Sequence, residues 1–368
     1  MSSAPVENRK PPASSKEEIE LLSEVVKLLN RIDKASLPPE LKENTKESLY
    51  RLNRSMRFGS YQAEYEKTAR YIERIVSLPW NTRSEDKLDL VEAKKILDKN
   101  HYGLTDIKNR ILEYLAVLKL RKEKEKSGVI KFSRSPVICL VGLPGTGKTS
   151  FAESVAEALG RKFVRIAMGG MSNALMLRGQ SKTIPEAEMG QVMKNLRRAG
   201  TKNPVLLLDE IDSTSEKAES DLMGVLLELL DPEQNFSFTD YYLDYPFDLS
   251  EVLFICSANQ VGNITRAVAD RLEVIIMPRY TDEDKIKIAR DYILPKEFEN
   301  VALEPSLVKF TDDVWPHIIK PFGYDIDVRS LQRTVNAILR KVARAYIEGR
   351  VKEVTISKTN LPEYLPSW

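Results

Sequence analysis

The chain has 368 residues, of which 42% are hydrophobic and 30% charged, and its 56 basic and 54 acidic residues leave a formal net charge of +2. This length allows two or three domains with buried cores, and the balanced charge gives no general argument for binding nucleic acid or an acidic membrane surface. Two cysteines and two histidines, scattered along the chain, do not form a typical metal-ligand cluster. We therefore interpret Cys139 and Cys256 as small core residues in a reducing compartment.

The N-terminal part is expected to be helical after a polar lead. Residues 1–15 are rich in Pro, Ser and charge, which predicts disorder, and they lack the apolar segment of a signal peptide. No apolar run approaches the ~20 residues of a membrane span, so we expect a cytoplasmic protein. Residues 16–80 show three- and four-residue apolar spacing, which predicts a helical module, and residues 78–90 look like a linker. The two predicted stripes are Ile19, Leu22, Val26 and Leu29, and then Tyr61, Tyr65, Ile72 and Val76.

The middle of the chain has the pattern of a parallel sheet covered by helices. From Val137 on, short β-branched runs alternate with longer amphipathic segments, which predicts an α/β domain over residues 81–278. After Pro278 no further strand is expected. Thr281 and Asp284 have capping-box spacing, and the sequence predicts a helical domain over residues 279–368. The predicted strand runs are VICLVG, FVRIAM, PVLLLDEI, VLFICSAN and VIIMP.

The stretch VGLPGTGKTS, residues 141–150, matches the P-loop pattern between a strand-like and a helix-like run. Glycines let successive backbone N–H groups turn toward phosphate oxygens, and the following helix adds its positive N-terminal end. Lys148 is expected to reach the β- and γ-phosphates of ATP, and the Thr149 hydroxyl to bind Mg²⁺. The nucleotide-binding residues predicted here are Gly142, Leu143, Pro144, Gly145, Thr146, Gly147, Lys148, Thr149 and Ser150.

Polar residues at two other strand ends suit the same reaction. PVLLLDEID ends in Asp209 and Glu210. An acid at position 209 can hold Mg²⁺ through its water shell, and Glu210 can orient and deprotonate the attacking water. Asn259 follows VLFICSA, where an amide can help to position that water near the γ-phosphate; an ordinary loop asparagine is the alternative.

Residues 78–365 resemble the AAA+ ATPase part of the Lon protease family, and residues 16–77 are more weakly similar to the helices that precede it. The resemblance implies an AAA+ fold, in which a P-loop α/β domain with a parallel sheet is followed by a helical lid domain and preceded by a helical N-terminal module. The matching stretches are LPW, ILDKNHYGL, RILEYLAV, GLPGTGKTS, AEALGRKFVRI, AGTKNPVLLLDEID, LLELLDPEQN, PFDLSEVLFICSAN and DRLEVI.

The resemblance also implies further site residues. Arg271 in DRLEVI matches the arginine finger that completes a neighbour's site, and Arg329 in DVRSLQR matches the sensor-2 arginine of the lid. An exposed surface role is the alternative for both. His101, Tyr102 and Gly103 lie where the family contacts adenine. If Arg271 acts in trans, the active form is a ring, for example a hexamer, or another head-to-tail homo-oligomer.

The chain departs from the family pattern in three places. It ends at NLPEYLPSW, where Lon enzymes continue into a serine–lysine protease domain, so we expect no peptidase activity from this chain. The first pore loop, RGQSKTIPEAEMGQ, has Ile184 in place of an aromatic residue, followed by Glu186 and Glu188. The second, DSTSEKAESDLMG, is charged at Lys217 and Glu219. Such loops are more hydrated and hold an extended polypeptide less firmly than an aromatic loop does. The sequence leaves open whether they thread polypeptide.

The leading hypothesis is a Mg²⁺–ATP-dependent AAA+ ATPase of Lon type that couples hydrolysis to the remodelling or unfolding of a protein partner. One alternative is a Lon-type unfoldase that hands its substrate to a separate protease. Another is a nucleotide-controlled scaffold in which hydrolysis is incidental. DNA binding is a weaker hypothesis, because the balanced charge offers no electrostatic footprint for it.

Overall fold

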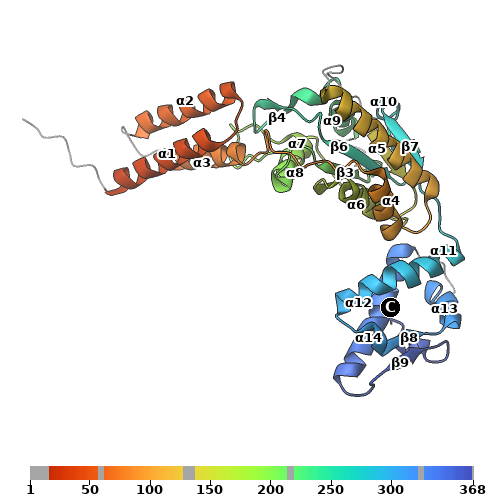
Figure 1. Cartoon of the computed structure of the whole chain (residues 1–368). Helices are drawn as coiled ribbons and strands as arrows, with labels where there is room; N and C mark the ends of the chain where they lie inside the picture. Colours follow the sequence, from red (N-terminus) through yellow and green to blue (C-terminus); the bar gives the residue numbers. More distant parts are fainter. Residues whose placement is uncertain (1–15, 57–61, 127–136, 214–218, 322–326, 367–368) are drawn as a thin grey trace, which may run out of the picture.

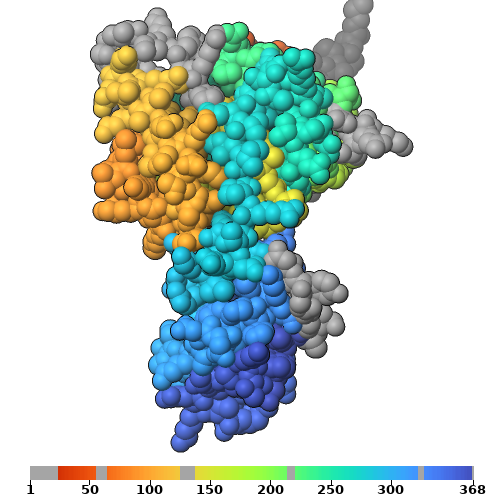
Figure 2. All heavy atoms as spheres, turned by 90° about the vertical axis from the view of Figure 1, so that its right-hand side faces the viewer, coloured from red at the N-terminus to blue at the C-terminus, as the bar shows by residue number. Residues whose placement is uncertain are grey.

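The computed structural model describes residues 16–56, 62–126, 137–213, 219–321 and 327–366. N-terminal helices, a central α/β domain and a C-terminal domain follow one another along the chain (Figure 1). In Figure 2 the α/β domain and the C-terminal domain form two masses joined by a narrower segment. The lead at residues 1–15, Lys217 and the side chain of Glu219 lie outside the described residues. No helix in the described part of the chain is long and apolar enough to cross a membrane.

The N-terminal helices pack on one another, but the buried stripe of the first helix differs from the expected one. Val25 and Leu28 are buried, whereas Val26 is 54% exposed. Both sets satisfy three- and four-residue spacing, so periodicity alone could not choose between them. Tyr65 and Ile72 of the third helix are buried as expected. The three helices are α1 (Lys16–Lys34), α2 (Pro39–Met56) and α3 (Gln62–Val76).

The segment that follows α3 is fixed to the α/β domain and is not a free linker. The indole N–H of Trp80 donates to the Ile75 carbonyl at 3.0 Å, and its ring centroid lies 4.9 Å from that of Phe247. Arg83 donates two hydrogen bonds to the Glu251 carboxylate, at 2.6 and 2.7 Å. Aromatic packing and a bidentate ion pair therefore tie the N-terminal helices to the domain that follows.

The α/β domain is built on a five-stranded parallel sheet in the order β2–β3–β6–β1–β7, which confirms the predicted α/β architecture. The three central strands β3, β6 and β1 are buried along their whole length, as expected for a sheet covered on both faces. One apolar cluster joins the sheet to α4, α5 and α6, and another joins its other face to α8, α9 and the N-terminal helices. The strands of this sheet are β1 (Val137–Val141), β2 (Phe163–Ala167), β3 (Val205–Asp209), β6 (Leu253–Ala258) and β7 (Leu272–Ile276). The helices of the domain are α4 (Leu90–Asn100), α5 (Thr105–Lys126), α6 (Lys148–Leu159), α7 (Leu175–Arg178), α8 (Gln191–Ala199), α9 (Glu219–Leu230) and α10 (Arg266–Ala269), with 3₁₀ turns η1 (Asn235–Ser237) and η2 (Val261–Asn263).

The two cysteines belong to the core of this sheet. Cys139 of β1 and Cys256 of β6 are register partners in neighbouring strands, and both side chains are fully buried. Burial raises the pKa of the Cys139 thiol to about 12 and that of Cys256 well above its usual value. Both therefore stay neutral thiols, in agreement with their interpretation as core residues.

A small hairpin, which the sequence pattern did not reveal, lies beside the sheet. Its strands are β4 (Phe238–Asp240) and β5 (Tyr245–Phe247), which pair antiparallel. The buried Asp240 carboxylate accepts the N–H groups of Gly190 at 2.7 Å, Tyr242 at 2.9 Å and Leu243 at 3.1 Å. Burial raises the pKa of Asp240 to about 6. Through Asp240 the hairpin turn is fastened to the start of α8.

The C-terminal domain has its own apolar cluster around α14. The Thr281–Asp284 capping box is confirmed at the start of α11. A π-helical turn, η3, ends two residues before Pro295, which has no N–H to continue the α-helical ladder. The expectation of no further strand was wrong, because β8 and β9 form a short parallel pair; three-residue strands leave no periodic signal. The elements are α11 (Asp282–Lys287), η3 (Ile288–Ile293), α12 (Leu294–Val301), η4 (Pro305–Leu307), β8 (Val308–Phe310), η5 (Asp312–Val314), α13 (Trp315–Ile319), α14 (Val328–Ile347), β9 (Val354–Ile356) and α15 (Leu361–Tyr364).

Candidate functional site

Glycines shape the loop between β1 and α6. Gly145 and Gly147 have φ angles of +77° and +92°, in the left-handed region that favours glycine. A Cβ atom on Gly142 would lie 2.8 Å from the Met277 carbonyl oxygen, and one on Gly145 would lie 2.7 Å from the Asp327 side chain. Asp327 caps α14. The tip of the loop therefore meets the first turn of a helix from the C-terminal domain.

The Lys148 ammonium lies inside this loop. Its Nζ atom donates to the carbonyls of Gly142 at 2.5 Å and Leu143 at 3.0 Å, and to Asn259 Oδ1 at 3.0 Å. Lys148 opens α6 after β1, and Asn259 follows β6, the neighbouring strand. The parallel sheet thus brings together two residues that are far apart in the sequence, at the carboxyl ends of its strands.

Charges from two segments surround Lys148: the end of β3 with the turn after it, and the first turn of α14. Burial lowers the pKa of Lys148, while the carboxylates of Asp209, Asp212 and Glu210 oppose that shift. The positive charge of Arg329 adds to the lowering. Arg329 is exposed on the first turn of α14, so the C-terminal domain presents it within electrostatic reach of Lys148.

Thr149 and Asp209 lie next to each other at the same edge of the sheet. The Thr149 hydroxyl donates to Asp209 Oδ2 at 3.3 Å, and Asp209 Oδ1 accepts the Ser257 hydroxyl. Arg165 Nε donates to Asp209 Oδ2 at 2.6 Å. A hydroxyl beside a carboxylate is an oxygen donor set that fits Mg²⁺. Sequence reasoning missed Ser257 and Arg165, because each lies inside a strand and belongs to no motif.

Glu210 is held in an unusual backbone conformation. Its φ angle is +59°, which is uncommon for a residue with a side chain. Its N–H donates to Ser257 Oγ at 2.9 Å, and its carboxylate lies against Gly169, where a Cβ atom would be 2.8 Å from Oε2. The neighbouring Asp212 accepts the N–H of Asn259 at 2.9 Å. The ends of β3 and β6 are therefore linked by side chains.

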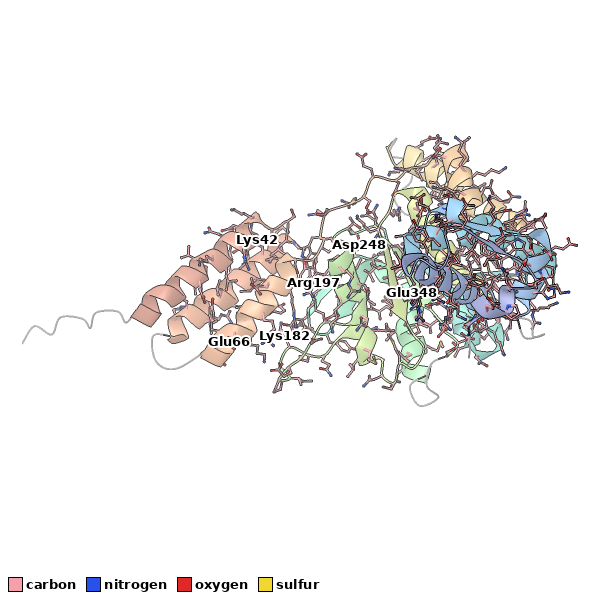
Figure 3. All side chains as sticks on the ribbon, turned by 90° about the horizontal axis from the view of Figure 1, so that it is seen from below. Lys42, Glu66, Lys182, Arg197, Asp248 and Glu348 are labelled. Carbon is pink, nitrogen blue, oxygen red and sulfur yellow. The ribbon has the colours of Figure 1, made fainter. Side chains whose placement is uncertain are left out.

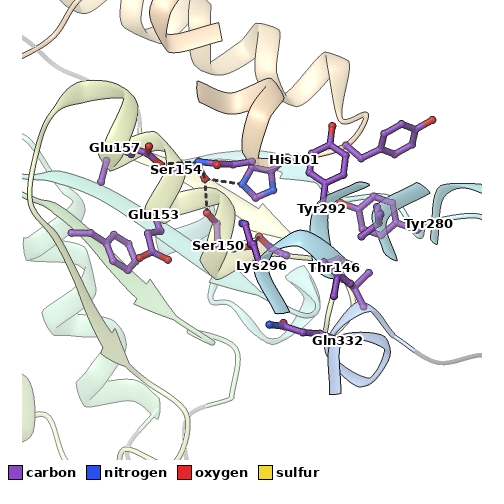
Figure 4. Close-up of a pocket in the computed structure, with 18 of the residues that line it drawn as sticks. His101, Thr146, Ser150, Glu153, Ser154, Glu157, Tyr280, Tyr292, Lys296 and Gln332 are labelled. Carbon is purple, nitrogen blue, oxygen red and sulfur yellow. Dashed lines mark hydrogen bonds between the residues drawn. The ribbon is translucent and has the colours of Figure 1, made fainter. Parts of the chain in front are cut away.

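A cavity of about 660 Å³ opens beside the loop, between the α4–α5 turn, α6 and the C-terminal domain (Figure 4). His101, Tyr102, Thr146 and Ser150 are among the residues that line it, whereas Gly103, with φ +61°, is not. The C-terminal domain contributes lining residues that no sequence motif predicted, because they come from three separate helices and the segment before them. These are Tyr280, Ile288, Tyr292, Ile293, Lys296, Val328 and Gln332.

His101 and Tyr102 differ in what they contact. His101 is buried, with Nε2 2.9 Å from Ser154 Oγ and its ring centroid 5.1 Å from that of Phe151. Burial lowers the pKa of His101 to about 4, so its ring is neutral at neutral pH. The Tyr102 hydroxyl accepts a hydrogen bond of 3.1 Å from Lys287 in α11. The α4–α5 turn thus offers a neutral ring to the cavity and binds the C-terminal domain.

Arg271 lies at the other end of the sheet. It directly precedes Leu272, the first residue of β7, which pairs with Val137 at the start of β1. Its guanidinium donates to the Ala267 carbonyl at 2.8 Å and to Asp231 Oδ2 at 3.0 Å. A five-residue strand spans roughly 16 Å. Within one copy of the chain, Arg271 is therefore separated from the P-loop by the length of the sheet.

Two family models match the chain. The model described as "ATPase family associated with various cellular activities (AAA)" matches residues 138–280. The model described as "Lon protease AAA+ ATPase lid domain" matches residues 299–355. The first match covers the sheet and the strand-end residues, and the second lies in the C-terminal domain.

The chain is also similar to curated proteins. It is 44% identical over 345 residues to "Lon protease 2" of Thermus thermophilus, which covers 93% of this chain and 42% of that protein. It is 41% identical over 350 residues to "Lon protease" of Clostridioides difficile, with 95% of this chain and 43% of that protein covered. For "Lon protease 1" of Bacillus subtilis the identity is 41% over 342 residues, covering 93% and 43%. The chain thus spans about two fifths of the length of these relatives.

Proposed function

We propose, on the premise that this chain belongs to the AAA+ ATPases of the Lon type, that it binds ATP with Mg²⁺ at the P-loop and hydrolyses it. One observation carries the proposal: the 3.0 Å hydrogen bond between Lys148 Nζ and Asn259 Oδ1, directly beside the Thr149–Asp209 pair. Cation, hydroxyl, carboxylate and amide meet at one edge of the sheet, as phosphoryl transfer from a nucleotide requires.

The parts of the site suit the parts of the nucleotide. The cavity beside the loop, with the neutral ring of His101 and the ring of Tyr102 among its walls, suits the base and sugar. The turned backbone of residues 142–147 and the start of α6 suit the phosphates. Thr149 and Asp209 would hold Mg²⁺, which when bound neutralises charge on the phosphate oxygens.

The residues of the chain itself are assigned distinct roles. Glu210 accepts a proton from the attacking water, from a position fixed by its N–H bond to Ser257. Asn259 orients that water. Lys148 and Arg329 bring positive charge to the phosphate chain, where negative charge builds up in the transition state. The lid would carry Arg329 toward or away from the site as it moves.

Arg271 requires a second copy of the chain. Because it lies at the opposite end of the sheet from its own P-loop, we assign it to the site of a neighbouring copy, as an arginine finger. A residue supplied in one direction only implies a head-to-tail assembly, which is a ring where the rotation between copies closes. The proposal divides the chain into a helical module over residues 16–80, an ATPase domain over 81–278 and a lid over 279–368.

The work done with ATP is proposed to be the remodelling or unfolding of a polypeptide client. The cavity is lined by both the α/β domain and the C-terminal domain, so its occupancy sets how the two domains sit against each other. The relatives are named proteases, and the chain spans about two fifths of their length. The proposal therefore concerns the ATP-driven step alone.

One experiment tests the proposal: phosphate release and particle mass are measured together over a range of protein concentrations, with ATP and Mg²⁺. A shared site predicts that the rate per subunit rises as subunits associate. A rate per subunit that stays flat through assembly would contradict the shared site. Assembly driven equally well by a non-hydrolysable ATP analogue, without measurable turnover, would favour a nucleotide-controlled scaffold instead.

A further inference from the structure

The segment over residues 180–188, called loop 180–188 below, forms a closed turn. The Gln180 N–H donates to the Glu188 carbonyl at 3.1 Å, and the Ile184 N–H donates to the Ser181 carbonyl at 2.9 Å. Glu186 has a φ angle of +58°, which turns the backbone back on itself. Ile184 is 48% exposed at the tip of the turn. The loop therefore presents the apolar side chain of Ile184, next to the exposed Pro185, on a defined backbone.

Basic residues of α3 contact this loop along its length. Residues 67, 70 and 74 follow three- and four-residue spacing, which places them on one face of the helix. Lys67 Nζ donates to the Thr183 carbonyl at 3.4 Å, and Arg70 lies 3.6 Å from the Glu186 carboxylate. Further along, Arg74 donates to the Ala187 carbonyl at 3.3 Å. One helical face thus follows the loop from residue 183 to residue 187.

These contacts are not equally strong. The side chains of Arg70 and Glu186 are 48% and 90% exposed, so water and salt screen their attraction. The Arg74 side chain is only 16% exposed, and it lies 3.6 Å from the Glu188 carboxylate. Its guanidinium carbon is 4.9 Å from the ring centroid of Tyr242. Arg74 is therefore the anchor of the contact, and Arg70 contributes less.

The loop also reaches back to α3. Lys182 Nζ lies 5.0 Å from the ring centroid of Tyr71 and 2.8 Å from Asp244 Oδ2. The Tyr71 hydroxyl donates to the Leu243 carbonyl at 2.8 Å. In Figure 3, Lys182 lies at the junction between the N-terminal helices and the α/β domain. Helix α3, loop 180–188 and the β4–β5 turn therefore form one packed unit.

We propose that the N-terminal module positions loop 180–188 for contact with a polypeptide client, and that Arg74 is the main positioning residue. The acids at 186 and 188 make the loop a poorer grip on an extended chain. Glu186 faces Arg70 of α3, and Glu188 lies between Arg74 of α3 and its closer partner Lys194 of α8. Ile184 is left as the outward contact of the loop. The proposal rests on the proposed function, in that the loop contacts the client. Its structural part, the hold of α3 on the loop, is independent of ATP.

The test compares Arg74→Gln with a matched control, Arg31→Gln, in the full chain. Arg31 is an exposed arginine of the same module, paired with Glu73 at 2.7 Å. We expect Arg74→Gln to speed hydrogen exchange at the amides of residues 181–188 by about tenfold or more, and Arg31→Gln to leave it within about twofold. Arg74→Lys, which keeps the charge but loses the planar guanidinium, should fall between them. Glu188→Lys approaches the same contact from the loop and should also speed exchange, which covers the case in which an α3 variant fails to fold. Because Glu188 also pairs with Lys194 of α8, Lys194→Gln is its control and should speed exchange less.

The second readout is ATP turnover with and without a permanently unfolded test protein, such as reduced and alkylated α-lactalbumin. Arg74→Gln should keep the basal rate within about twofold and lose most of the stimulation by the test protein. Unchanged exchange in both Arg74→Gln and Glu188→Lys would overturn the proposal, and so would faster exchange with full stimulation. If the unaltered chain shows no turnover at all, the proposed function fails, while the exchange comparison still decides whether α3 holds the loop.

Discussion

The two ends of the central sheet differ in how completely one copy of the chain satisfies the residues to which we assign a function. At the carboxyl ends of the strands, Lys148, Asp209 and Asn259 are held by hydrogen bonds within the chain, and Lys148 and Asp209 are buried. At the amino end of β7, the side chain of Arg271 is 34% exposed and is tied to Asp231 and to the Ala267 carbonyl of the preceding helix α10. The groups at the carboxyl ends of the strands therefore satisfy one another within one copy, whereas Arg271 at the amino end of β7 is partly exposed to solvent.

This difference teaches how such a site can depend on assembly. Buried groups that satisfy one another need no partner to reach their positions, because an unpaired buried charge would be costly. A partly exposed guanidinium is free to exchange one acceptor for another at little cost. We therefore expect nucleotide binding to be a property of one copy, and hydrolysis to be a property of two.

The largest effect is expected at the amino end of β7, where Arg271 lies. Arg271→Ala should lower ATP turnover by about 10³-fold or more, as loss of an arginine finger does. Mixing it with Lys148→Ala should restore part of the rate, because the second variant lends its Arg271 to the intact P-loop of the first. Phosphate release from the mixture is the measurement. Arg266→Ala, an exposed arginine five residues away, should be nearly neutral. A mixture no faster than its parents would show that Arg271 does not act across copies.

The next largest effect is expected at the carboxyl ends of the strands. Glu210→Gln should keep the shape of the side chain but remove the proton acceptor, so turnover should fall by about 10²- to 10⁴-fold. Nucleotide affinity, measured by calorimetry, should stay within a few-fold. Glu92→Gln, on the exposed side of α4, is the matched control. Turnover close to that of the unaltered chain would remove Glu210 from the mechanism.

Low pH should lower the free energy of unfolding through the buried His101. Its pKa is about 4 in the folded chain and about 6.5 when unfolded, so between these values the unfolded state binds more protons. Stability is therefore retained above pH 6.5 and lost as the pH falls toward 4, by up to about 3 kcal/mol. Chemical denaturation at pH 7, 6 and 5 should show this slope, and His101→Gln should flatten it. His317→Gln is the control; an unaltered slope in His101→Gln would contradict the assignment.

The smallest effect is expected when the tether of Arg271 is loosened. Asp231→Asn removes the charge partner but keeps an acceptor, and a partly exposed pair contributes at most about 1 kcal/mol. Thermal unfolding should shift by only a few degrees, and turnover should change by no more than about threefold. A loss as large as that of Arg271→Ala would mean that Asp231 fixes the finger instead of merely resting against it.

The amino-acid sequence by itself determined the P-loop, the acids after β3 and the amide after β6. These positions depend on local rules: glycines that permit left-handed turns, and β-branched runs whose carboxyl ends meet at one edge of a parallel sheet. The capping box at Thr281 is equally local. Each signal lies within a few consecutive residues, which is why the pattern of the chain was sufficient to predict it.

Only the tertiary structure decided the rest. One side of the cavity comes from helices of the C-terminal domain, far along the chain, and the contact of Arg74 with loop 180–188 joins segments more than one hundred residues apart. Long polar and aromatic side chains carry no periodic signal for such partners, because their contacts depend on how whole elements pack. For the same reason Trp80 looked like part of a linker, and the three-residue strands β8 and β9 were not foreseen.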